Sequence, residues 1–255
     1  MCFAEGSFRE VLNLGKPLGS LGFPHQPARR PAAHRLQPHR PQHAPGGELS
    51  LDVASMPRGY GATLPDWVFD ELAEVPEALP GVRERMALVH RLAARNPLEG
   101  SGGPFAALVV NTADGQLVAA GVNLVLSSGL SATHAEVVAL SLAQARVGTW
   151  DLGAEAAERE LVVNWRPCAQ CYGATLWSGV RRLVIAGEGP ELEALTGFDE
   201  GPMREDWAEQ LRRRGIEVVS DVLREEALEV FAGYRRMVDE QGLTVYNARG
   251  AASAM

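Results

Sequence analysis

From about residue 64 the chain alternates between short apolar runs and longer stretches in which apolar residues recur every three or four positions. The short runs are rich in valine, leucine and alanine, and most end at asparagine, aspartate or glycine, as strands do. They lie at residues 105–111, 116–123, 160–165, 181–187 and 216–221. The longer stretches predict helices, which we place at residues 75–96, 134–147, 168–178, 204–214 and 223–239.

The order of these elements predicts the architecture. The first two strands are joined by the sequence TADG, in which Asp114-Gly115 favours a hairpin. The later strands alternate with helices, and such helices carry the chain back across a sheet. We therefore expect a mixed sheet that is covered by helices on both faces. The helix at residues 134–147 is apolar on nearly every side, so it should be buried.

The first part of the chain has a different composition. Residues 24–46 are rich in proline, arginine, histidine and glutamine and contain almost no large apolar side chain. Such a segment cannot bury enough surface to offset the conformational entropy that folding removes. We expect residues 1–55 to be a disordered leader and residues 56–255 to be the folded domain. Because Met56 would be a natural start, a chain that begins there should fold and turn over substrate like the full chain.

Charge and cysteine content narrow the classes of function. The chain has 255 residues and a net charge of −8, and the leader carries +2, so the domain carries −10. An acidic surface disfavours a polynucleotide partner. No apolar run reaches the roughly eighteen residues that a membrane span needs, and the N-terminus lacks the features of a secretory signal. Three cysteines, an odd number, do not make a disulfide framework, so we expect a cytoplasmic protein.

The sequence THAE, residues 133–136, permits two interpretations. Thr133 can cap a helix, and Glu136 then stands at the third helical position, which is the spacing of a capping box and a purely structural role. In that interpretation His134 is a first-turn histidine without a special function. A functional interpretation needs partners from elsewhere in the chain.

The sequence RPCAQC, residues 166–171, can supply such partners. Pro167 suits a helix start, and Cys168 and Cys171 are three residues apart, so both thiols face one side of the first turn. The helix N-terminus favours the thiolate, which is the form that binds metal. A thioredoxin-like redox pair has the same position, and the tryptophan just upstream fits it. A structural zinc site would need two further ligands, and the chain has no second cysteine pair.

The two segments together favour a catalytic zinc ion, one per chain. His134, Cys168 and Cys171 would give three ligands and leave the fourth position for water, as catalytic sites do. Glu136, two residues from the histidine, would carry the proton that this water releases. A His-x-Glu motif followed by Pro-Cys-x-x-Cys is the signature of zinc nucleobase deaminases. A thiol redox protein that uses the two cysteines is the alternative of another class, and it gives no reason for the His-Ala-Glu sequence.

From residue 96 to about residue 240 the chain resembles the cytidine deaminase-like superfamily. The resemblance covers most of the domain and rests on GGPFAALVVN, GVN, THAEVVAL, PCAQCYGATLWSGVRRLVIAG and TGFDEGP. It implies a three-layer α/β/α fold with a mixed five-stranded sheet, a homodimer, and one zinc ion held by His134, Cys168 and Cys171. It further implies that Glu136 protonates the ring nitrogen and the leaving ammonia of a small nucleobase or nucleoside.

Within the superfamily, the GGPF segment, Trp177 and the GFDE segment look most like bacterial guanine deaminases. This resemblance implies a role in purine metabolism. It also implies a set of residues that bind the base, namely Asn123, Trp177 and either Asp199 or Glu200. The sequence alone is equally consistent with Asn123 being a turn residue at the end of a strand. Cytosine or cytidine and the adenosine of a tRNA are the alternative substrates, and the acidic domain disfavours the tRNA.

Three segments depart from the family pattern. The residue before Pro-Cys is usually glutamate or serine, and here it is Arg166. Ala169-Gln170 stands where a methionine usually precedes the second cysteine, and GLSAT replaces Asp-Pro-Thr before His134. These changes leave the zinc ligands intact and lie near the expected pocket, so they bear on which base is bound.

Overall fold

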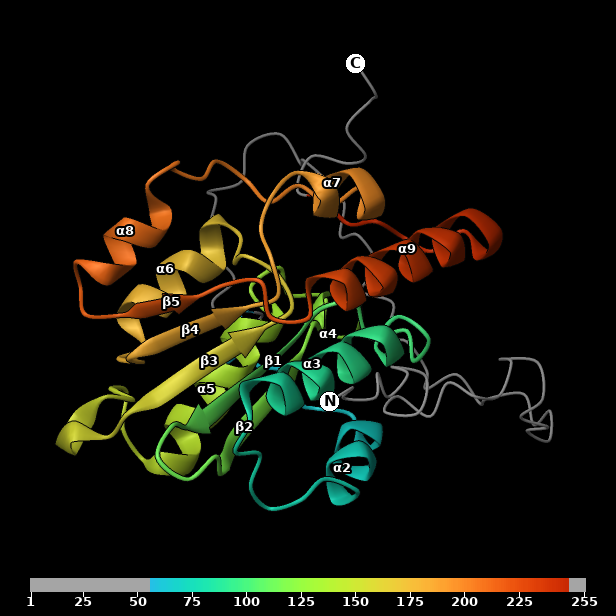
Figure 1. Ribbon diagram of the computed structural model, residues 1–255. Helices are drawn as coiled ribbons and strands as arrows, with labels where there is room; N and C mark the ends of the chain where they lie inside the picture. Colours follow the sequence, from blue (N-terminus) through green and yellow to red (C-terminus); the bar gives the residue numbers. More distant parts are fainter. Residues whose placement is uncertain (1–55, 248–255) are drawn as a thin grey trace, which may run out of the picture. The chain divides into compact units, whose positions relative to one another are not determined.

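The computed structural model describes residues 56–247, so the predicted leader, residues 1–55, lies outside the described residues (Figure 1). The chain divides into two units after Tyr60, and the described helices and strands belong to the second unit. In that unit five strands form a sheet in the order β2-β1-β3-β4-β5. They are β1 (Ala106–Asn111), β2 (Leu117–Val122), β3 (Arg159–Val163), β4 (Arg182–Ile185) and β5 (Glu217–Val219).

The sheet is mixed, as the order of elements predicts. β1 pairs antiparallel with β2 and with β3, whereas β3, β4 and β5 run parallel to one another. The predicted hairpin between β1 and β2 turns at Gly115, whose φ of +74° is a left-handed conformation that favours glycine. A Cβ at Gly115 would also lie 2.6 Å from the carbonyl oxygen of Leu79, so this turn has no room for another side chain.

Eight α-helices and one short 3₁₀ turn (Ala154–Ala156) accompany the sheet in the described residues. The helices are α2 (Asp66–Ala73), α3 (Val82–Arg95), α4 (Val125–Ser128), α5 (Ala135–Val147), α6 (Ala169–Trp177), α7 (Glu191–Thr196), α8 (Trp207–Arg212) and α9 (Arg224–Gln241).

One predicted helix boundary is wrong. The first predicted helix, at residues 75–96, begins only at Val82. Pro80 and Gly81 immediately precede it, and proline is tolerated only in the first turn of a helix because it lacks an amide hydrogen and clashes with the preceding turn. Leu79 instead donates its amide hydrogen to the carbonyl of Gly115 over 2.8 Å, outside any helix. The sequence pattern also missed α2, α4 and α7, which are short.

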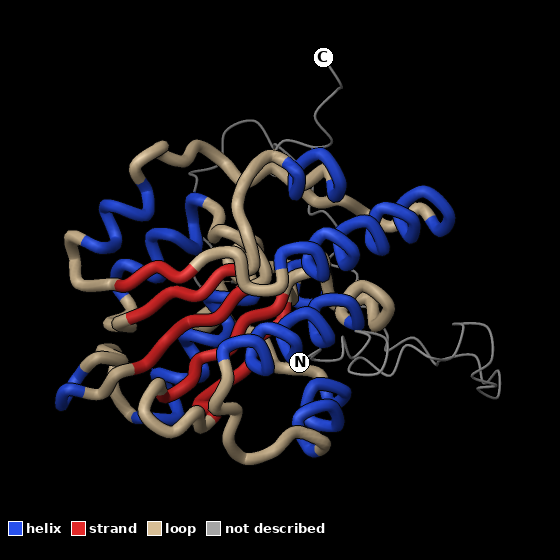
Figure 2. Tube along the Cα trace, in the orientation of Figure 1, coloured by secondary structure: helices blue, strands red, loops and turns tan. Residues whose placement is uncertain are grey.

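Two hydrophobic cores lie on opposite faces of the sheet, because successive side chains of a strand point to opposite faces. Leu108 and Val110 of β1 belong to the core that includes residues of α3 and α9. Ala107 and Val109 of the same strand belong to the core that includes residues of α5, α6 and α8. Figure 2 shows the sheet between the two sets of helices. This arrangement confirms the predicted three-layer α/β/α fold with its mixed five-stranded sheet.

His90 of α3 is a titratable group inside the first of these cores. Its side chain is 1% exposed, and neither ring nitrogen has a hydrogen-bond partner among the described residues. Burial lowers the pKa of His90 from 6.5 to about 4. The folded domain therefore holds this imidazole in its neutral form.

We expect this histidine to make the domain less stable in acid. Below pH 6.5 the unfolded chain binds a proton that the folded chain excludes until about pH 4, so stability is complete above pH 6.5 and falls as the pH decreases. The loss from this residue should approach roughly 3 kcal/mol near pH 4. Urea unfolding at pH 7 and pH 4.5 should show a smaller loss of stability for His90→Leu than for the unchanged protein. Equal losses in the two proteins would contradict this assignment.

Candidate active site

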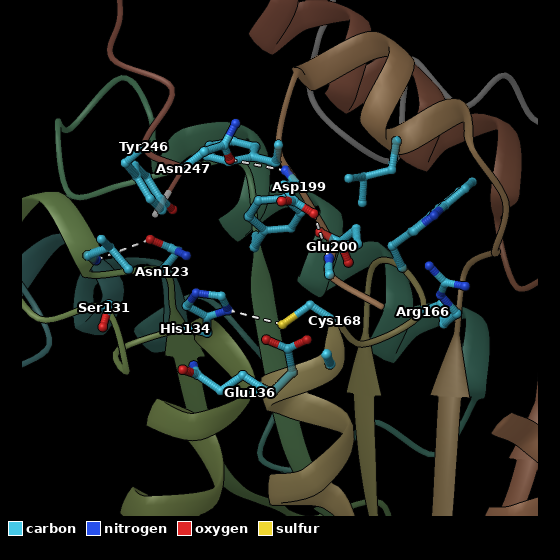
Figure 3. Close-up of a pocket in the computed structure, with 18 of the residues that line it drawn as sticks. Asn123, Ser131, His134, Glu136, Arg166, Cys168, Asp199, Glu200, Tyr246 and Asn247 are labelled. Carbon is cyan, nitrogen blue, oxygen red and sulfur yellow. Dashed lines mark hydrogen bonds between the residues drawn. The ribbon is translucent and has the colours of Figure 1, made fainter. Parts of the chain in front are cut away.

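The two sequence motifs meet because each lies at the start of a helix on the same side of the sheet. α5 begins at Ala135 with His134 as its N-cap residue, and α6 begins at Ala169 with Cys168 as its N-cap residue. α6 follows the carboxyl end of β3, and the two helices contact each other. Figure 3 shows His134, Glu136 and Cys168 pointing toward one another between these helix ends.

The three predicted ligands have the spacing that zinc requires. Nδ1 of His134 lies 3.5 Å from Sγ of Cys168 and 3.5 Å from Sγ of Cys171. All three ligand atoms lie within 4.8 Å of one another. A tetrahedral zinc ion holds sulfur at about 2.3 Å and nitrogen at about 2.0–2.1 Å, which places two such ligands roughly 3.5–3.8 Å apart. One imidazole and two thiols therefore fit a zinc ion and leave its fourth position for water.

Hydrogen bonds prepare Cys168 to bind a metal. The neighbouring Cys171 lowers the pKa of Cys168 to about 4, and His134 adds to this shift although burial opposes it. The positive end of the α6 dipole favours the anion as well. Because the thiolate is the metal-binding form of cysteine, this local environment suits a zinc ligand.

Glu136 lies beside the ligands and is 7% exposed. The thiol of Cys171 donates a hydrogen bond of 3.3 Å to its Oε2. Burial raises the pKa of Glu136, and the negative charge of Cys168 raises it further. A raised pKa makes this carboxyl group easier to protonate, as a group that carries protons during catalysis must be.

The capping-box interpretation of Glu136 is wrong. Its helix begins after His134, so Glu136 occupies the second helical position rather than the third, and the structure shows no side-chain hydrogen bond from the N-cap residue. The hydroxyl of Thr133 instead donates to the carbonyl of Leu130 over 2.7 Å. The local fold therefore offers no capping role for this glutamate.

A pocket of about 650 Å³ lies against the ligands and Glu136 (Figure 3). Three of the predicted base-binding residues, Asn123, Asp199 and Glu200, line it. Four aromatic residues, Phe105, Trp165, Phe198 and Tyr246, also line it. Aromatic walls suit a flat heterocycle, which can stack on such rings.

Asn123 is oriented by its own loop. Its side chain is 2% exposed, and its Oδ1 accepts a hydrogen bond of 3.1 Å from the amide of Val125. Nδ2 of Asn96 holds the backbone of the same residue through its carbonyl, over 2.8 Å. In Figure 3 the amide nitrogen of Asn123 faces the pocket, so it can donate to a bound molecule.

Asp199 and Glu200 differ in their surroundings. Asp199 is exposed, and its Oδ1 accepts the amide hydrogen of Gly201 over 2.8 Å in a turn. Glu200 is 9% exposed. Burial raises the pKa of Glu200 to about 9, the charges of Cys168 and Glu136 add to the shift, and Arg166 opposes it. Glu200 is thus the member of this pair that is buried and protonated at neutral pH.

Trp177, the fourth predicted base-binding residue, does not line the pocket as the structure describes it. It is the last residue of α6, at the end of the helix away from Cys168, and its side chain is 83% exposed. Trp177 and Cys171 are six positions apart, so their side chains point roughly 120° apart around the helix. The expectation that Trp177 binds the base is therefore wrong for a single chain.

The sequence pattern missed two residues that complete the pocket, Tyr246 and Asn247, which follow the last helix. The amide of Gly103 donates a hydrogen bond of 3.2 Å to the hydroxyl of Tyr246. Asn247 accepts from the amide of Asp199 over 3.0 Å and donates to the carbonyl of Gly197 over 3.0 Å. The segment after α9 is therefore fixed above the pocket, as Figure 3 shows.

Comparison with known proteins agrees with this site. Residues 82–187 match the family described as the cytidine and deoxycytidylate deaminase zinc-binding region. Guanine deaminase from Bacillus subtilis is 29% identical over 150 residues, which are 59% of this chain and 91% of that protein. The tRNA-specific adenosine deaminase of the same organism is 34% identical over 121 residues, which are 48% of this chain and 68% of that protein. A solved structure of guanine deaminase from Nitrosomonas europaea has 41% identity and a TM-score of 0.66, and the match covers 71% of this chain and 98% of that chain.

The matched zinc-binding region contains the three residues that can hold a metal ion. The match to the Nitrosomonas europaea structure extends well beyond that region of the chain. A thiol redox protein would explain neither the histidine beside the two thiols nor these similarities. The chain therefore belongs to the cytidine deaminase-like family and is a zinc-dependent hydrolytic deaminase.

Proposed function

We propose that the substrate is guanine or a closely guanine-like base. The observation that carries this proposal is the position of two buried carboxyl groups in one pocket, Glu136 beside the zinc ligands and Glu200 in the wall. A purine offers ring nitrogens on two sides, so it can engage both groups at once. The similarity to two guanine deaminases supports the choice of base.

In the proposed reaction a ring carbon exchanges its amino group for the oxygen of water, and ammonia leaves. Zinc held by His134, Cys168 and Cys171 would lower the pKa of a bound water to roughly 7 and so supply the nucleophile. The carboxylate of Glu136 accepts the proton of that water and delivers it to the ring nitrogen next to the attacked carbon. The carboxylate then takes the remaining proton from the hydroxyl that was added to the carbon and transfers it to the amino group, so that the C–N bond breaks, ammonia leaves and the carbon keeps a carbonyl oxygen.

The remaining pocket residues hold the base. Asn123 donates from Nδ2 to an acceptor on the base, since its Oδ1 is already engaged by Val125. Glu200, protonated at neutral pH, donates its proton to a ring nitrogen. Tyr246 closes the pocket from the segment after α9, which excludes bulk water from the reacting atoms.

A panel of substrates tests this function. Guanine, cytosine, cytidine, adenosine and an unmodified tRNA would be incubated with the zinc-loaded protein, and ammonia release would be measured. We expect guanine to give the highest kcat/KM and the tRNA to give no release, since the domain carries a net charge of −10. Turnover of cytosine or cytidine without turnover of guanine would refute the proposed substrate.

We also infer that the protein acts as a cytoplasmic homodimer in purine metabolism. Two free thiols must stay reduced to bind zinc, which supports a reducing compartment. None of the helices between residues 56 and 247 combines the length and apolar character that crossing a membrane requires. The predicted buried helix α5 has an exposed face that includes the uncharged Ser141, Leu142 and Ala145. The exposed Arg146 of the same helix donates from its guanidinium to the carbonyls of Leu117 and Val118. The adjacent α6 presents Gly173 and Trp177, also uncharged, so the two helices offer an apolar surface to a second copy.

Trp177→Glu should therefore convert the dimer to a monomer, because the substitution would place two buried charges in the interface. Size-exclusion chromatography with light scattering would measure the mass. Leu98→Glu is a matched control, since Leu98 is 59% exposed and lies beyond the end of α3. A dimer that survives Trp177→Glu, or that Leu98→Glu also breaks, would place the interface elsewhere.

A further inference from the structure

Arg166 is the pocket residue whose chemistry the proposed reaction does not use. It directly precedes Pro167 and Cys168, and its amide nitrogen donates to the carbonyl of Gly187 over 2.9 Å. Its side chain is half-buried and lines the pocket. Figure 3 shows Arg166 and Asn123 on opposite sides of the site, with His134 and Cys168 between them.

The guanidinium of Arg166 has no hydrogen bond and no ion pair with any residue between 56 and 247, and its Nε is buried without a partner. Six other arginines of this part of the chain are likewise not exposed, and each has a partner. These are Arg85, Arg91, Arg95, Arg159, Arg182 and Arg224. Among the arginines of this part of the chain that are not exposed, Arg166 is therefore the one whose side chain has no hydrogen-bond or ion-pair partner, and it is the one that lines the pocket.

An unpaired, partly desolvated cation is costly unless a ligand supplies the missing acceptor. Glu200 faces the same pocket, yet no ion pair or hydrogen bond joins it to Arg166 among the described residues. Among the other residues that line the pocket, only His134 can carry a positive charge, and zinc would occupy its ring nitrogen. Arg166 is thus the group in the pocket that can pair with an anion.

The pocket has room for such a group. Its volume of about 650 Å³ lies in the middle of the roughly 300–1,000 Å³ range of pockets that hold drug-sized ligands, and a free purine base is small by comparison. The planar guanidinium fork matches the oxygen pairs of phosphate and carboxylate groups. A base bound between the zinc ligands and Asn123 would leave the region next to Arg166 for a substituent.

We propose that Arg166 is a specificity-determining residue that binds an anionic substituent, a phosphate or a carboxylate, on a guanine-like substrate. This inference rests on the proposed function, since it assumes that the base itself is deaminated at the zinc site. Arg166 stands where the family usually has glutamate or serine. In this role it would let the protein recognise a charged group attached to the base as well as the base itself.

The test compares four compounds on the zinc-loaded protein. They are guanine, guanosine, guanosine 5′-phosphate and 9-(carboxymethyl)guanine, so that the phosphate and the carboxylate are separate arms and guanosine is the uncharged control. We expect one or both anionic compounds to exceed guanosine in kcat/KM, and Arg166→Gln to remove roughly 10–100-fold of that kcat/KM while guanine turnover changes little. Arg212→Gln is the matched control, because Arg212 is exposed on α8 and outside the pocket.

Two results would overturn the inference. One is that neither anionic compound is turned over by the unchanged protein with a higher kcat/KM than guanosine, and that neither inhibits guanine deamination more strongly than guanosine does. The other is that Arg166→Gln keeps that preference. If Arg166→Gln fails to fold, the comparison on the unchanged protein still decides. If the unchanged protein does not deaminate guanine, the proposed function fails. The anion site can then still be tested by calorimetry, which would compare the binding of the two anionic compounds to the unchanged protein and to Arg166→Gln.

Discussion

Replacing Cys168 with alanine should remove zinc and stability together. His134 and Cys171 alone cannot hold the ion well, because catalytic zinc needs three protein ligands. A metal that binds only the folded state stabilises it by mass action, so its loss should cost roughly 3–4 kcal/mol at ordinary zinc concentrations. For a domain of this size that corresponds to a fall in Tm of roughly 5–15 °C. Zinc analysis of the purified protein and thermal unfolding with and without added zinc would measure both effects.

The third cysteine offers a control for this substitution. Cys2 lies outside the described residues and in the predicted leader, so Cys2→Ala should keep zinc and Tm unchanged. Added zinc should raise the Tm of the unchanged, metal-stripped protein and should raise that of Cys168→Ala much less. Full zinc occupancy in Cys168→Ala would show that the ligand set is wrong.

The zinc-ligand set could be predicted from the sequence because its geometry is local. His134 and Cys168 each stand at a helix start, where backbone and side chain directions are narrowly defined. The spacing of Cys168 and Cys171 places both thiols on one side of the first turn, and the structure brings both within 3.5 Å of the same imidazole nitrogen. The contact between the two helix starts depends on the tertiary fold. The alternation of strands and helices in the sequence already indicated a fold that brings them together.

The pocket could be predicted only in part, because its walls come from distant segments. Tyr246 contacts Gly103 across 143 residues of sequence, and the short stretch after α9 has no periodicity that would place it over the site. For Trp177 the error is the opposite one, because the sequence placed in the pocket a residue that does not line it. A motif that is shared with a family does not say which face of a helix a residue occupies. α7 was missed because it has only six residues, too few for a helical pattern of apolar positions to be recognised.

Glu136 is the residue for which a structural role and a catalytic role predict the most different results. As a purely structural residue it could contribute only its hydrogen bond with the thiol of Cys171, since the capping box is absent from the described helix start. As the proton carrier it would contribute little to folding or to zinc binding and would be essential for turnover. Glutamine has nearly the same shape as glutamate and can occupy the same position, but it cannot carry a proton.

Glu136→Gln should therefore give a folded, zinc-loaded protein whose deamination rate is lower by roughly 10²–10⁴-fold, the usual contribution of general acid–base catalysis. Zinc content, Tm and ammonia release from the best substrate of the panel would be measured on the same preparation. Glu229→Gln, an exposed position on α9, is the matched control and should leave all three unchanged. Glu136→Asp should retain part of the activity, because it keeps the carboxyl group and only shortens its reach. If Glu136→Gln deaminates at a near-normal rate while it holds zinc, another group must carry the proton, and the mechanism proposed for this site fails.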